Sequence, residues 1–251
     1  MIEPALKFIE SAYDDNSIGT FLNHFREKGY FVMPSVFQRD SVDAYREQLI
    51  EAAVKDSSGR YSMPTDSPLC IEPTKAPRLR CMLPGALSHA RMFPRPSLFE
   101  VSWLISPAES EPRPLFWHKD REHEGMPGNE YHYPRDVHIG MYFEDMTLEH
   151  GPTQVISRSH RDQSRSPHSG HEVDSFLCNK QDVVIWDQRL WHRGATRTIP
   201  GLRIYALFGF YSVPTYGDND IRPMPLAQRR LAEESADPAE KRFYGGPFTQ
   251  K

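Results

Sequence analysis

Two histidines, a carboxylate and an arginine have the types and spacing of a redox metal site. His118 and Asp120 form an H-x-D triplet, His192 follows much later in the chain, and Arg203 comes shortly after it. On an extended strand, residues two apart point to the same side, so His118 and Asp120 can face one metal ion. Two histidines and one carboxylate bind one side of iron(II) and leave positions open for a cosubstrate and oxygen. The set predicts a mononuclear iron centre.

A second H-x-D triplet, His160-Arg161-Asp162, competes with the first. It lies in a stretch rich in Ser and Arg and bounded by Gly and Pro, which is typical of a loop. Too few residues separate it from His192 for the strands that close a barrel, at about five or six residues each. His118 instead follows an apolar stretch that can form a strand. We therefore predict that the first triplet holds the metal.

Arg203 adds the evidence that the triplet alone lacks, because a chain with 11 histidines contains H-x-D triplets by chance. It lies in the apolar run 202–208, which indicates a buried strand. A buried arginine is costly unless it meets an anion, and its guanidinium group matches a carboxylate. The anion is either an internal Asp or Glu or a dicarboxylate cosubstrate.

Three blocks of the sequence resemble the phytanoyl-CoA dioxygenase family. They are Phe116-Trp117-His118-Lys119-Asp120, the stretch from Val137 through Gly151-Pro152 to Arg161, and the stretch from Asp182 through His192 to Arg203. The N-terminal Gly29-Tyr30-Phe31-Val32 is also in the family's style. The blocks occur in the family's order and spacing, and the resemblance covers residues 17–213.

The resemblance implies an iron(II)- and 2-oxoglutarate-dependent dioxygenase with molecular oxygen as cosubstrate. His118, Asp120 and His192 would be the catalytic metal ligands. Arg203 would bind the distal carboxylate of 2-oxoglutarate.

The chain departs from the family pattern at two places. Ser157-Arg158-Ser159-His160 stands where the family usually has Pro-Gly-Ser-His. The family often has a serine two positions after the second histidine, and this chain has Gly194 there. Thr196 is the candidate that would take over the serine's part in holding the cosubstrate. Trp117 and Trp191 adjoin ligands, so either is a candidate wall of the iron pocket instead of a core residue.

The implied reaction is hydroxylation of a small-molecule metabolite at an unactivated carbon, with release of succinate and carbon dioxide, as in secondary metabolism. Asp120 favours hydroxylation because related halogenases replace this carboxylate with a small residue. Desaturation, cyclisation and endoperoxide formation use the same oxidant and stay open. The rivals of another class are a zinc-dependent hydrolase, which gives Arg203 no role, and a non-catalytic cupin-like protein.

Composition fits one domain that uses a small-molecule substrate. The chain has 251 residues, long enough for one large core. A net charge of −4 gives no basic footprint for nucleic acid. Three cysteines argue against a disulfide framework. No apolar run approaches the roughly 18 residues of a membrane span, and the N-terminus lacks the basic start of a signal peptide. We expect a cytoplasmic protein, and the oligomeric state stays open.

The order of elements predicts a mainly β fold with flanking helices. A helix around Phe21 and Phe25 stops at Gly29, and a second helix, from Ser41 to about Val54, is capped by Asp40. We expect buttressing helices over residues 17–56, a core over 98–213 and a charged tail over 214–251. The predicted strands are 30–33, 99–106, 115–120, 137–144, 154–156, 182–186 and 203–212. Such a pattern favours a double-stranded β-helix, a cupin-like jelly roll.

Two loops are candidates for substrate contact. The first, 122–135, leaves directly after the metal triplet. The second, 57–85, carries Lys75, Arg78 and Arg80 among several prolines. The large aromatic residues are expected in the core: Trp103, Phe116, Trp117, Trp186 and Trp191.

Overall fold

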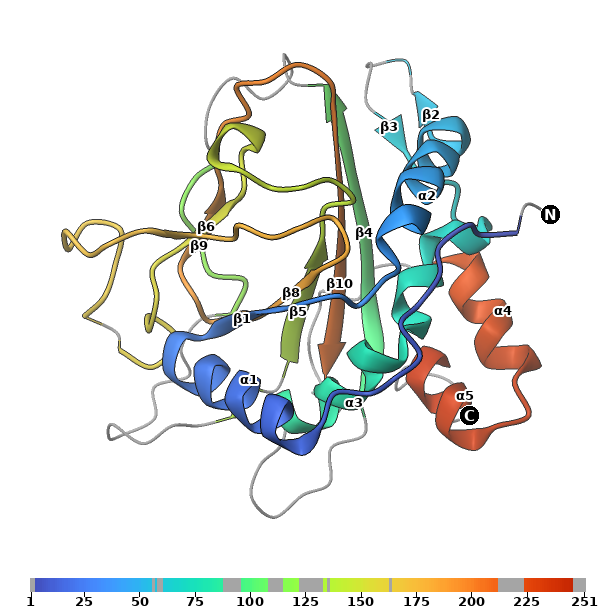
Figure 1. Ribbon diagram of the computed structural model, residues 1–251, viewed down its shortest axis with the longest axis horizontal. Helices are drawn as coiled ribbons and strands as arrows, with labels where there is room; N and C mark the ends of the chain where they lie inside the picture. The colour runs from blue at the N-terminus through green and yellow to red at the C-terminus, as the bar shows by residue number, and fades with distance from the viewer. Residues whose placement is uncertain are drawn as a thin grey trace.

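Two antiparallel sheets build the core of the protein (Figure 1). The computed structural model describes residues 3–55, 57, 61–87, 96–107, 115–121, 133–134, 136–162, 164–211 and 224–245. The larger sheet has the order β1-β8-β5-β10-β4-β3-β2 and the smaller sheet the order β7-β6-β9. This double-sheet arrangement is the jelly roll expected from the sequence.

Strand β1 has the predicted bounds, and β4, β5, β6, β8 and β10 lie where they were predicted, with shifted ends. The short strands β2, β3, β7 and β9 were not predicted. The larger sheet contains β1 (Tyr30–Met33), β2 (Val54–Lys55), β3 (Tyr61–Ser62), β4 (Ser97–Pro107), β5 (Asp136–Met141), β8 (Val183–Asp187) and β10 (Leu202–Tyr211). The smaller sheet contains β6 (Thr153–Val155), β7 (Asp174–Ser175) and β9 (His192–Gly194). The prediction of a strand over 115–120 was wrong, because this segment makes only one isolated bridge, from His118 to His192.

Strand β8 is buried on both faces and separates two hydrophobic cores. Val183 and Ile185 belong to the main core, whereas Val184 and Trp186 belong to a second one. This division follows from the alternation of side chains along a strand. The second core contains residues of both sheets, so we call it the inter-sheet core. Its buried members are Tyr142, Met146, Val155, Phe176, Val184, Trp186 and Leu190.

Helix α1 (Asp15–Lys28) begins and ends as its sequence indicates. The side chain of Asp14 accepts a hydrogen bond from the N–H of Ser17, 2.7 Å away. Gly29 has φ +89° and its N–H donates to the carbonyl of Phe25, so the predicted stop at Gly29 is confirmed.

Helix α2 (Arg39–Ala52) packs Tyr45 and Leu49 into the main core. Asp40 was predicted to cap it, but the cap residue is Gln38 and Asp40 lies in the first turn. A carboxylate there still interacts favourably with the helix dipole.

The segment expected to be a proline-rich loop is largely helical. It contains the 3₁₀-helices η1 (Pro68–Cys70) and η2 (Glu72–Lys75) and helix α3 (Pro77–Ala86). Its three cations have partners inside the protein: Lys75 pairs with Glu72, Arg78 donates to the carbonyls of Ser11 and Ser35, and Arg80 donates to Tyr244. These contacts give the three cations a role in holding the fold together, so no contact with substrate is needed to explain them.

The expected tail contains two helices that the sequence did not predict. Helices α4 (Leu226–Glu234) and α5 (Pro238–Gly245) pack together, and α5 contacts β4. Buried Gln228 joins them to the sheet, because its side-chain amide donates to the carbonyls of Leu98 and Tyr244.

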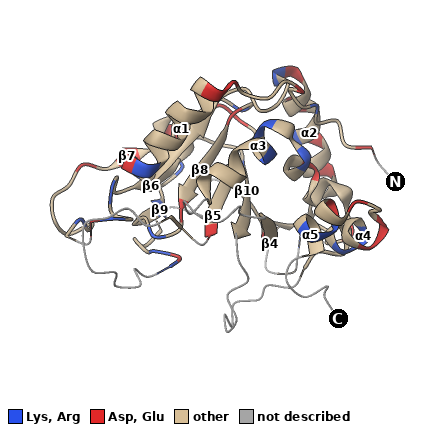
Figure 2. Ribbon diagram, turned by 90° about the horizontal axis from the view of Figure 1, so that it is seen from below, with Lys and Arg blue, Asp and Glu red and all other residues tan. Residues whose placement is uncertain are grey.

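Charged residues of both signs are interspersed along the helices and loops, and the strands are mostly free of them (Figure 2). Within the part of the chain that the structure describes, no helix has the length and apolar character to cross a membrane.

Candidate metal centre and cosubstrate site

The metal triplet lies at the edge of the smaller sheet. The backbone of His118 exchanges two hydrogen bonds with that of His192 in β9, at 3.0 and 2.9 Å. The N–H groups of Asp120 and Arg121 both donate to the carbonyl of Gln188. Backbone contacts therefore bring the early triplet beside the late histidine, although they are far apart in the chain.

The three predicted ligands converge on one point. Their ligand atoms lie within 4.8 Å of one another. Nε2 of His192 is 3.2 Å from Oδ2 of Asp120, and Nε2 of His118 is 3.6 Å from Oδ1. The His118 side chain is 46% exposed and the His192 side chain 8%, so the centre opens to solvent on the His118 side.

Both histidine rings are oriented for metal binding. Nδ1 of His118 is 2.9 Å from the carbonyl of Phe116, and Nδ1 of His192 is 3.0 Å from the carbonyl of Leu190. A carbonyl only accepts, so each Nδ1 must carry the proton, which leaves the lone pair of Nε2 free in the neutral ring. Such backbone partners are the usual way to fix a ligand histidine. The donor set fits iron(II).

Asp120 has a third neighbour that the sequence did not reveal. Nδ1 of buried His138, in β5, lies 3.0 Å from Oδ2 of Asp120. Burial alone would raise the pKa of Asp120, but the contacts with His138 and His192 lower it below the ordinary range. Burial likewise opposes a charge on His138, yet its contacts with Asp120 and Glu100 raise its pKa to about 9. The carboxylate is therefore ionised at neutral pH.

The second H-x-D triplet lies outside this group. His160 is buried, and its Nε2 is 3.1 Å from the carbonyl of Arg26 in α1. Asp162 instead accepts hydrogen bonds from Ser164 in its own turn. This triplet ties a loop to α1.

Arg203 lies near the start of β10 and is buried. Its Nη2 donates to the carbonyls of Gly151 and Ala195. Gly151 ends the 3₁₀-helix η4 (Leu148–His150), so Arg203 holds the end of this turn against the segment after β9.

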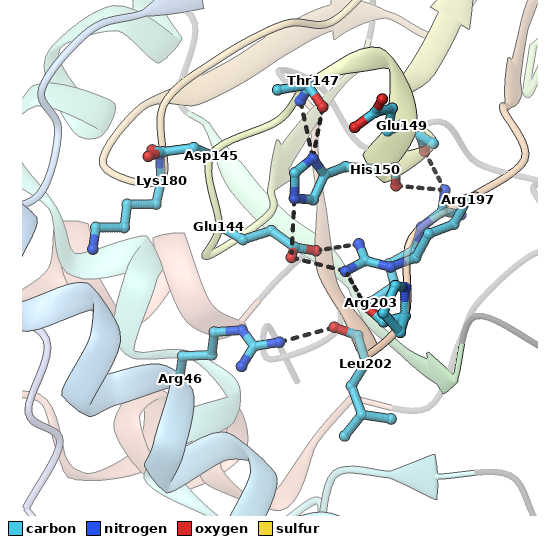
Figure 3. Close-up of polar contacts among 12 residues, drawn as sticks. Arg46, Glu144, Asp145, Thr147, Glu149, His150, Lys180, Arg197, Leu202 and Arg203 are labelled. Carbon is cyan, nitrogen blue, oxygen red and sulfur yellow. Dashed lines mark hydrogen bonds and ion pairs between the residues drawn. The ribbon is translucent and has the colours of Figure 1, made fainter.

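A second buried arginine lies beside Arg203 and has an internal carboxylate partner (Figure 3). Arg197 makes a two-pronged ion pair with Glu144, at 2.7 and 3.2 Å. His150 approaches the same carboxylate at 3.9 Å. Glu144 is thus paired with Arg197.

The hydroxyl groups of Tyr142, Thr153 and Tyr205 form a cluster. The hydroxyl of Tyr142 donates to the side chain of Thr153 at 2.7 Å and accepts from its N–H at 3.1 Å. The ring of Tyr205 is 4.8 Å from that of Tyr142. Burial raises the pKa of both tyrosines, so both stay protonated.

Sequence patterns did not single out this hydroxyl cluster. Gly140 is the one signal that favoured it, because a Cβ there would lie 2.8 Å from the Tyr205 hydroxyl and 2.9 Å from the Trp186 ring. A glycine inside a strand marks a close approach of other groups.

Thr196 and Trp117 are less closely joined to the centre. Thr196 is half-buried after β9, next to Ala195 and Arg197. The ring of Trp117 lies under the guanidinium of Arg193, 4.6 Å away. Trp117 directly precedes His118, and Arg193 directly follows His192. Because His118 and His192 point toward the proposed metal site, the side chains of Trp117 and Arg193 point to the other face of these segments. The part of Thr196 and Trp117 in cosubstrate binding stays a prediction.

The aromatic residues divide between core and surface. Trp186 is buried in the inter-sheet core and Trp103 packs against the main core. Phe116 was expected in the core, but it is 94% exposed, and the neighbouring Leu115 is 50% exposed. These two apolar residues lie just before His118 on its solvent side. Of the loop 122–135, only residues 133–134 are described.

A jelly roll that brings two histidines and an aspartate to one point is typical of mononuclear iron oxygenases. The family model for phytanoyl-CoA dioxygenase (PhyH) matches residues 87–204, which include the triplet, His192 and Arg203. Residues 87–204 therefore belong to the phytanoyl-CoA dioxygenase family, and the resemblance seen in the sequence is confirmed. The chain is an iron(II)- and 2-oxoglutarate-dependent oxygenase.

Solved structures share the fold. HygX from Streptomyces hygroscopicus, with nickel, 2-oxoglutarate and hygromycin B bound, is 20% identical with a TM-score of 0.60, over 81% of this chain and 94% of that chain. SnoN, a non-heme α-ketoglutarate-dependent epimerase from nogalamycin biosynthesis, is 14% identical with a TM-score of 0.61, over 90% and 93% of the two chains. SnoK, a carbocyclase from the same biosynthesis, is 20% identical with a TM-score of 0.50, over 80% and 88%. No curated protein matches the sequence.

Proposed function

We propose that this oxygenase hydroxylates a small-molecule metabolite at an unactivated carbon. His118, Asp120 and His192 hold the iron(II), and Arg203 binds the distal carboxylate of 2-oxoglutarate. The observation that carries the proposal is the convergence of the three ligand atoms, with both histidine rings turned by backbone carbonyls so that Nε2 faces Asp120.

When bound, iron(II) and 2-oxoglutarate would supply the oxidising power, because the cosubstrate loses carbon dioxide and takes up one atom of dioxygen as it becomes succinate, which leaves the other atom for the substrate. The chain's own residues bind and orient. Arg203 neutralises the distal carboxylate, and a guanidinium group fixes its direction as well as its charge. The hydroxyls of Tyr142 and Thr153 are hydrogen-bonded to each other, and we infer that they supply further hydrogen bonds to the cosubstrate.

The inter-sheet core keeps water from the inner side of the centre. Trp186 lies with its ring 6.1 Å from that of His192, and Phe176 packs on Trp186 at 5.6 Å. The substrate must therefore approach from the open side, next to His118. Exposed Leu115 and Phe116 offer it an apolar contact there.

The substrate class rests on proteins with the same fold. HygX was solved with hygromycin B, and SnoN with nogalamycin RO, both small molecules of antibiotic chemistry. We infer a natural-product substrate of comparable size for this chain. SnoN is an epimerase and SnoK a carbocyclase, so epimerisation or cyclisation is the second candidate outcome at the same centre. The location of the protein is a separate question, and a cytoplasmic location stays a prediction.

The proposal is tested by adding iron(II) and 2-oxoglutarate to metal-free protein without oxygen. We expect the visible charge-transfer band of the chelated cosubstrate in wild type and its loss in His192→Ala. The matched control is His160→Gln, which changes a buried histidine outside the triad and should keep the band. A folded wild-type protein without the band contradicts the proposal.

Arg203 is tested separately from the metal. Arg203→Ala should bind iron(II) like wild type but require far more 2-oxoglutarate, because the distal carboxylate loses its partner. An unchanged cosubstrate requirement would remove Arg203 from this role.

A further inference from the structure

Glu100 and His138 meet across a strand that lies between them. His138 is in β5 and Glu100 in β4, and β10 separates these strands (Figure 1). Both pair with the same residue of β10, Gly209. Residues opposite one another on antiparallel strands share a face, so all three point the same way.

Gly209 makes the contact possible because it has no side chain. A Cβ there would lie 2.9 Å from the Cβ of Glu100 and 2.7 Å from the ring of Phe99. The pairing of β10 with β4 also shifts directly after Gly209, which marks a bulge. Bulges beside a site commonly redirect a side chain. Here Oε2 of Glu100 comes within 3.3 Å of Nε2 of His138.

The Glu100–His138 pair is buried and ends at a proposed metal ligand. Glu100 is 5% exposed and His138 is 4% exposed. The hydroxyl of Ser102 donates to Oε1 of Glu100 at 2.9 Å. On the other side, Nδ1 of His138 lies 3.0 Å from Oδ2 of Asp120. A buried chain of polar groups thus runs from Ser102 to Asp120.

Of the three proposed ligands, Asp120 depends most on a side-chain partner that fixes its orientation. Each histidine ring has a backbone carbonyl that fixes it, from Phe116 for one and Leu190 for the other. Asp120 instead lies in a segment outside both sheets, and its side chain is 26% exposed. The last torsion of an aspartate is broad and weakly restrained. His138 approaches the carboxylate from the buried side, opposite the solvent.

We propose that His138, anchored by Glu100, is a positioning residue that fixes the carboxylate of Asp120 for metal binding. Each of the three ligands then has its own orienting partner, two carbonyls and one imidazole. The proposal rests on the function proposed above, because it takes Asp120 as a ligand. Partners of this kind change metal affinity by about 10–100-fold when they are removed.

Two substitutions at His138 separate positioning from simple packing. The amide nitrogen of asparagine reaches the place of Nδ1, so His138→Asn keeps a donor toward Asp120. The amide of glutamine reaches the place of Nε2, so His138→Gln keeps the contact with Glu100 and loses the one with Asp120. Both variants leave a polar side chain in the same buried position.

The measurement is calorimetric titration of the metal-free protein with iron(II) under anaerobic conditions, without cosubstrate. We expect His138→Gln to raise the dissociation constant about tenfold or more, as removal of such a partner does. His138→Asn should stay within about threefold of wild type. Metal-induced thermal stabilisation, followed by circular dichroism, should fall in the same order. The buried-histidine control, His160→Gln, should match wild type.

Other outcomes have distinct meanings. If wild type binds iron no better than His192→Ala, the proposed metal site itself fails. If wild type binds but His138→Gln binds equally well, the metal site stands and the positioning role is overturned. Equal losses in His138→Asn and His138→Gln would also overturn it, in favour of packing. If either His138 variant does not fold, Glu100→Gln carries the test: metal binding should weaken several-fold, and unchanged affinity would reject the proposal.

Discussion

Gly151 lies directly against the guanidinium group of Arg203, and its carbonyl accepts a hydrogen bond from Nη2. Gly151 has φ +70°, and a Cβ added to it would collide with that Nη2 and lie 2.7 Å from the carbonyl of Ala195. The absence of a side chain at Gly151 therefore allows the guanidinium group of Arg203 to take its observed position. The position of the proposed carboxylate clamp depends on a residue that offers only its backbone.

Gly151→Ala should weaken 2-oxoglutarate binding while sparing iron binding. The added methyl group displaces Arg203, and a displacement near 1 Å costs up to about 10²-fold in a positioned site. We expect at least about a tenfold rise in KM for 2-oxoglutarate, measured by succinate formation. Gly170→Ala is the matched control, because Gly170 has φ +68° but nothing within 4 Å of an added Cβ. A normal KM in Gly151→Ala would contradict the dependence.

Gly194, two positions after His192, allows a substitution that should strengthen 2-oxoglutarate binding instead of weakening it. A Cβ at Gly194 would lie 3.7 Å from Nη1 of Arg203 and 3.3 Å from the flexible end of Leu115. Gly194→Ser should fit after a small shift of Leu115 and lower KM for 2-oxoglutarate about threefold, the value of one modest hydrogen bond. Gly194→Ala supplies the methylene without the hydroxyl and should not lower KM.

Thr196 is the residue predicted to replace the missing serine. Thr196→Val should raise KM for 2-oxoglutarate, and the rise should be smaller when Gly194→Ser is also present, since one hydroxyl then substitutes for the other. Unchanged KM values in Thr196→Val would remove Thr196 from this role.

The sequence predicted the elements that repeat a pattern and missed those that depend on distant contacts. Strand β1 was predicted to the residue, because Gly29 ends the helix before it and the run 30–33 is apolar. Helices α4 and α5 were missed because what holds them is tertiary, the two hydrogen bonds of buried Gln228. Composition alone gives such a segment the character of a tail.

The proposed metal ligands could be selected from the sequence because His118, Asp120 and His192 occur together with Arg203, whereas their supporting groups could not. His138 lies in β5, in which every residue is buried, and Glu100 lies in β4, and neither local pattern marks these two residues as partners. Only the register through Gly209 brings the two together. Register depends on which strands pair, and that information is not local in the sequence.

A glycine inside helix α1 and the glycine that follows its last residue should respond to alanine in opposite directions. Gly19 lies inside the helix with nothing within 4 Å of an added Cβ, so Gly19→Ala should stabilise by roughly 0.5–1 kcal/mol through helix propensity. Gly29 has φ +89°, and an added Cβ would lie 2.6 Å from the ring of His160. Gly29→Ala should destabilise by about 1–3 kcal/mol. Urea unfolding measures both, and equal effects would contradict the assignment of the helix end.

His160 should make the stability of the protein fall in mild acid. Burial lowers its pKa from 6.5 to about 4, because the charged ring would lose its hydration. The unfolded chain therefore binds a proton between these pH values that the folded chain does not. The contribution of His160 is fully present above pH 6.5 and is lost as the pH falls toward 4, and it amounts to roughly 3 kcal/mol at 1.36 kcal/mol per pKa unit.

The free energy of unfolding in urea, measured at pH 7.5, 6 and 5, isolates this contribution. Carboxylates change stability over the lower part of the range in every variant, so the comparison between variants carries the result. His160→Gln should flatten the slope, since its amide does not titrate but can still donate toward the carbonyl of Arg26. His168→Gln, at an exposed histidine of the same loop region, should keep the wild-type slope. If the free energy of unfolding changes with pH equally in wild type and in His160→Gln, then His160 is not the group that takes up a proton on unfolding.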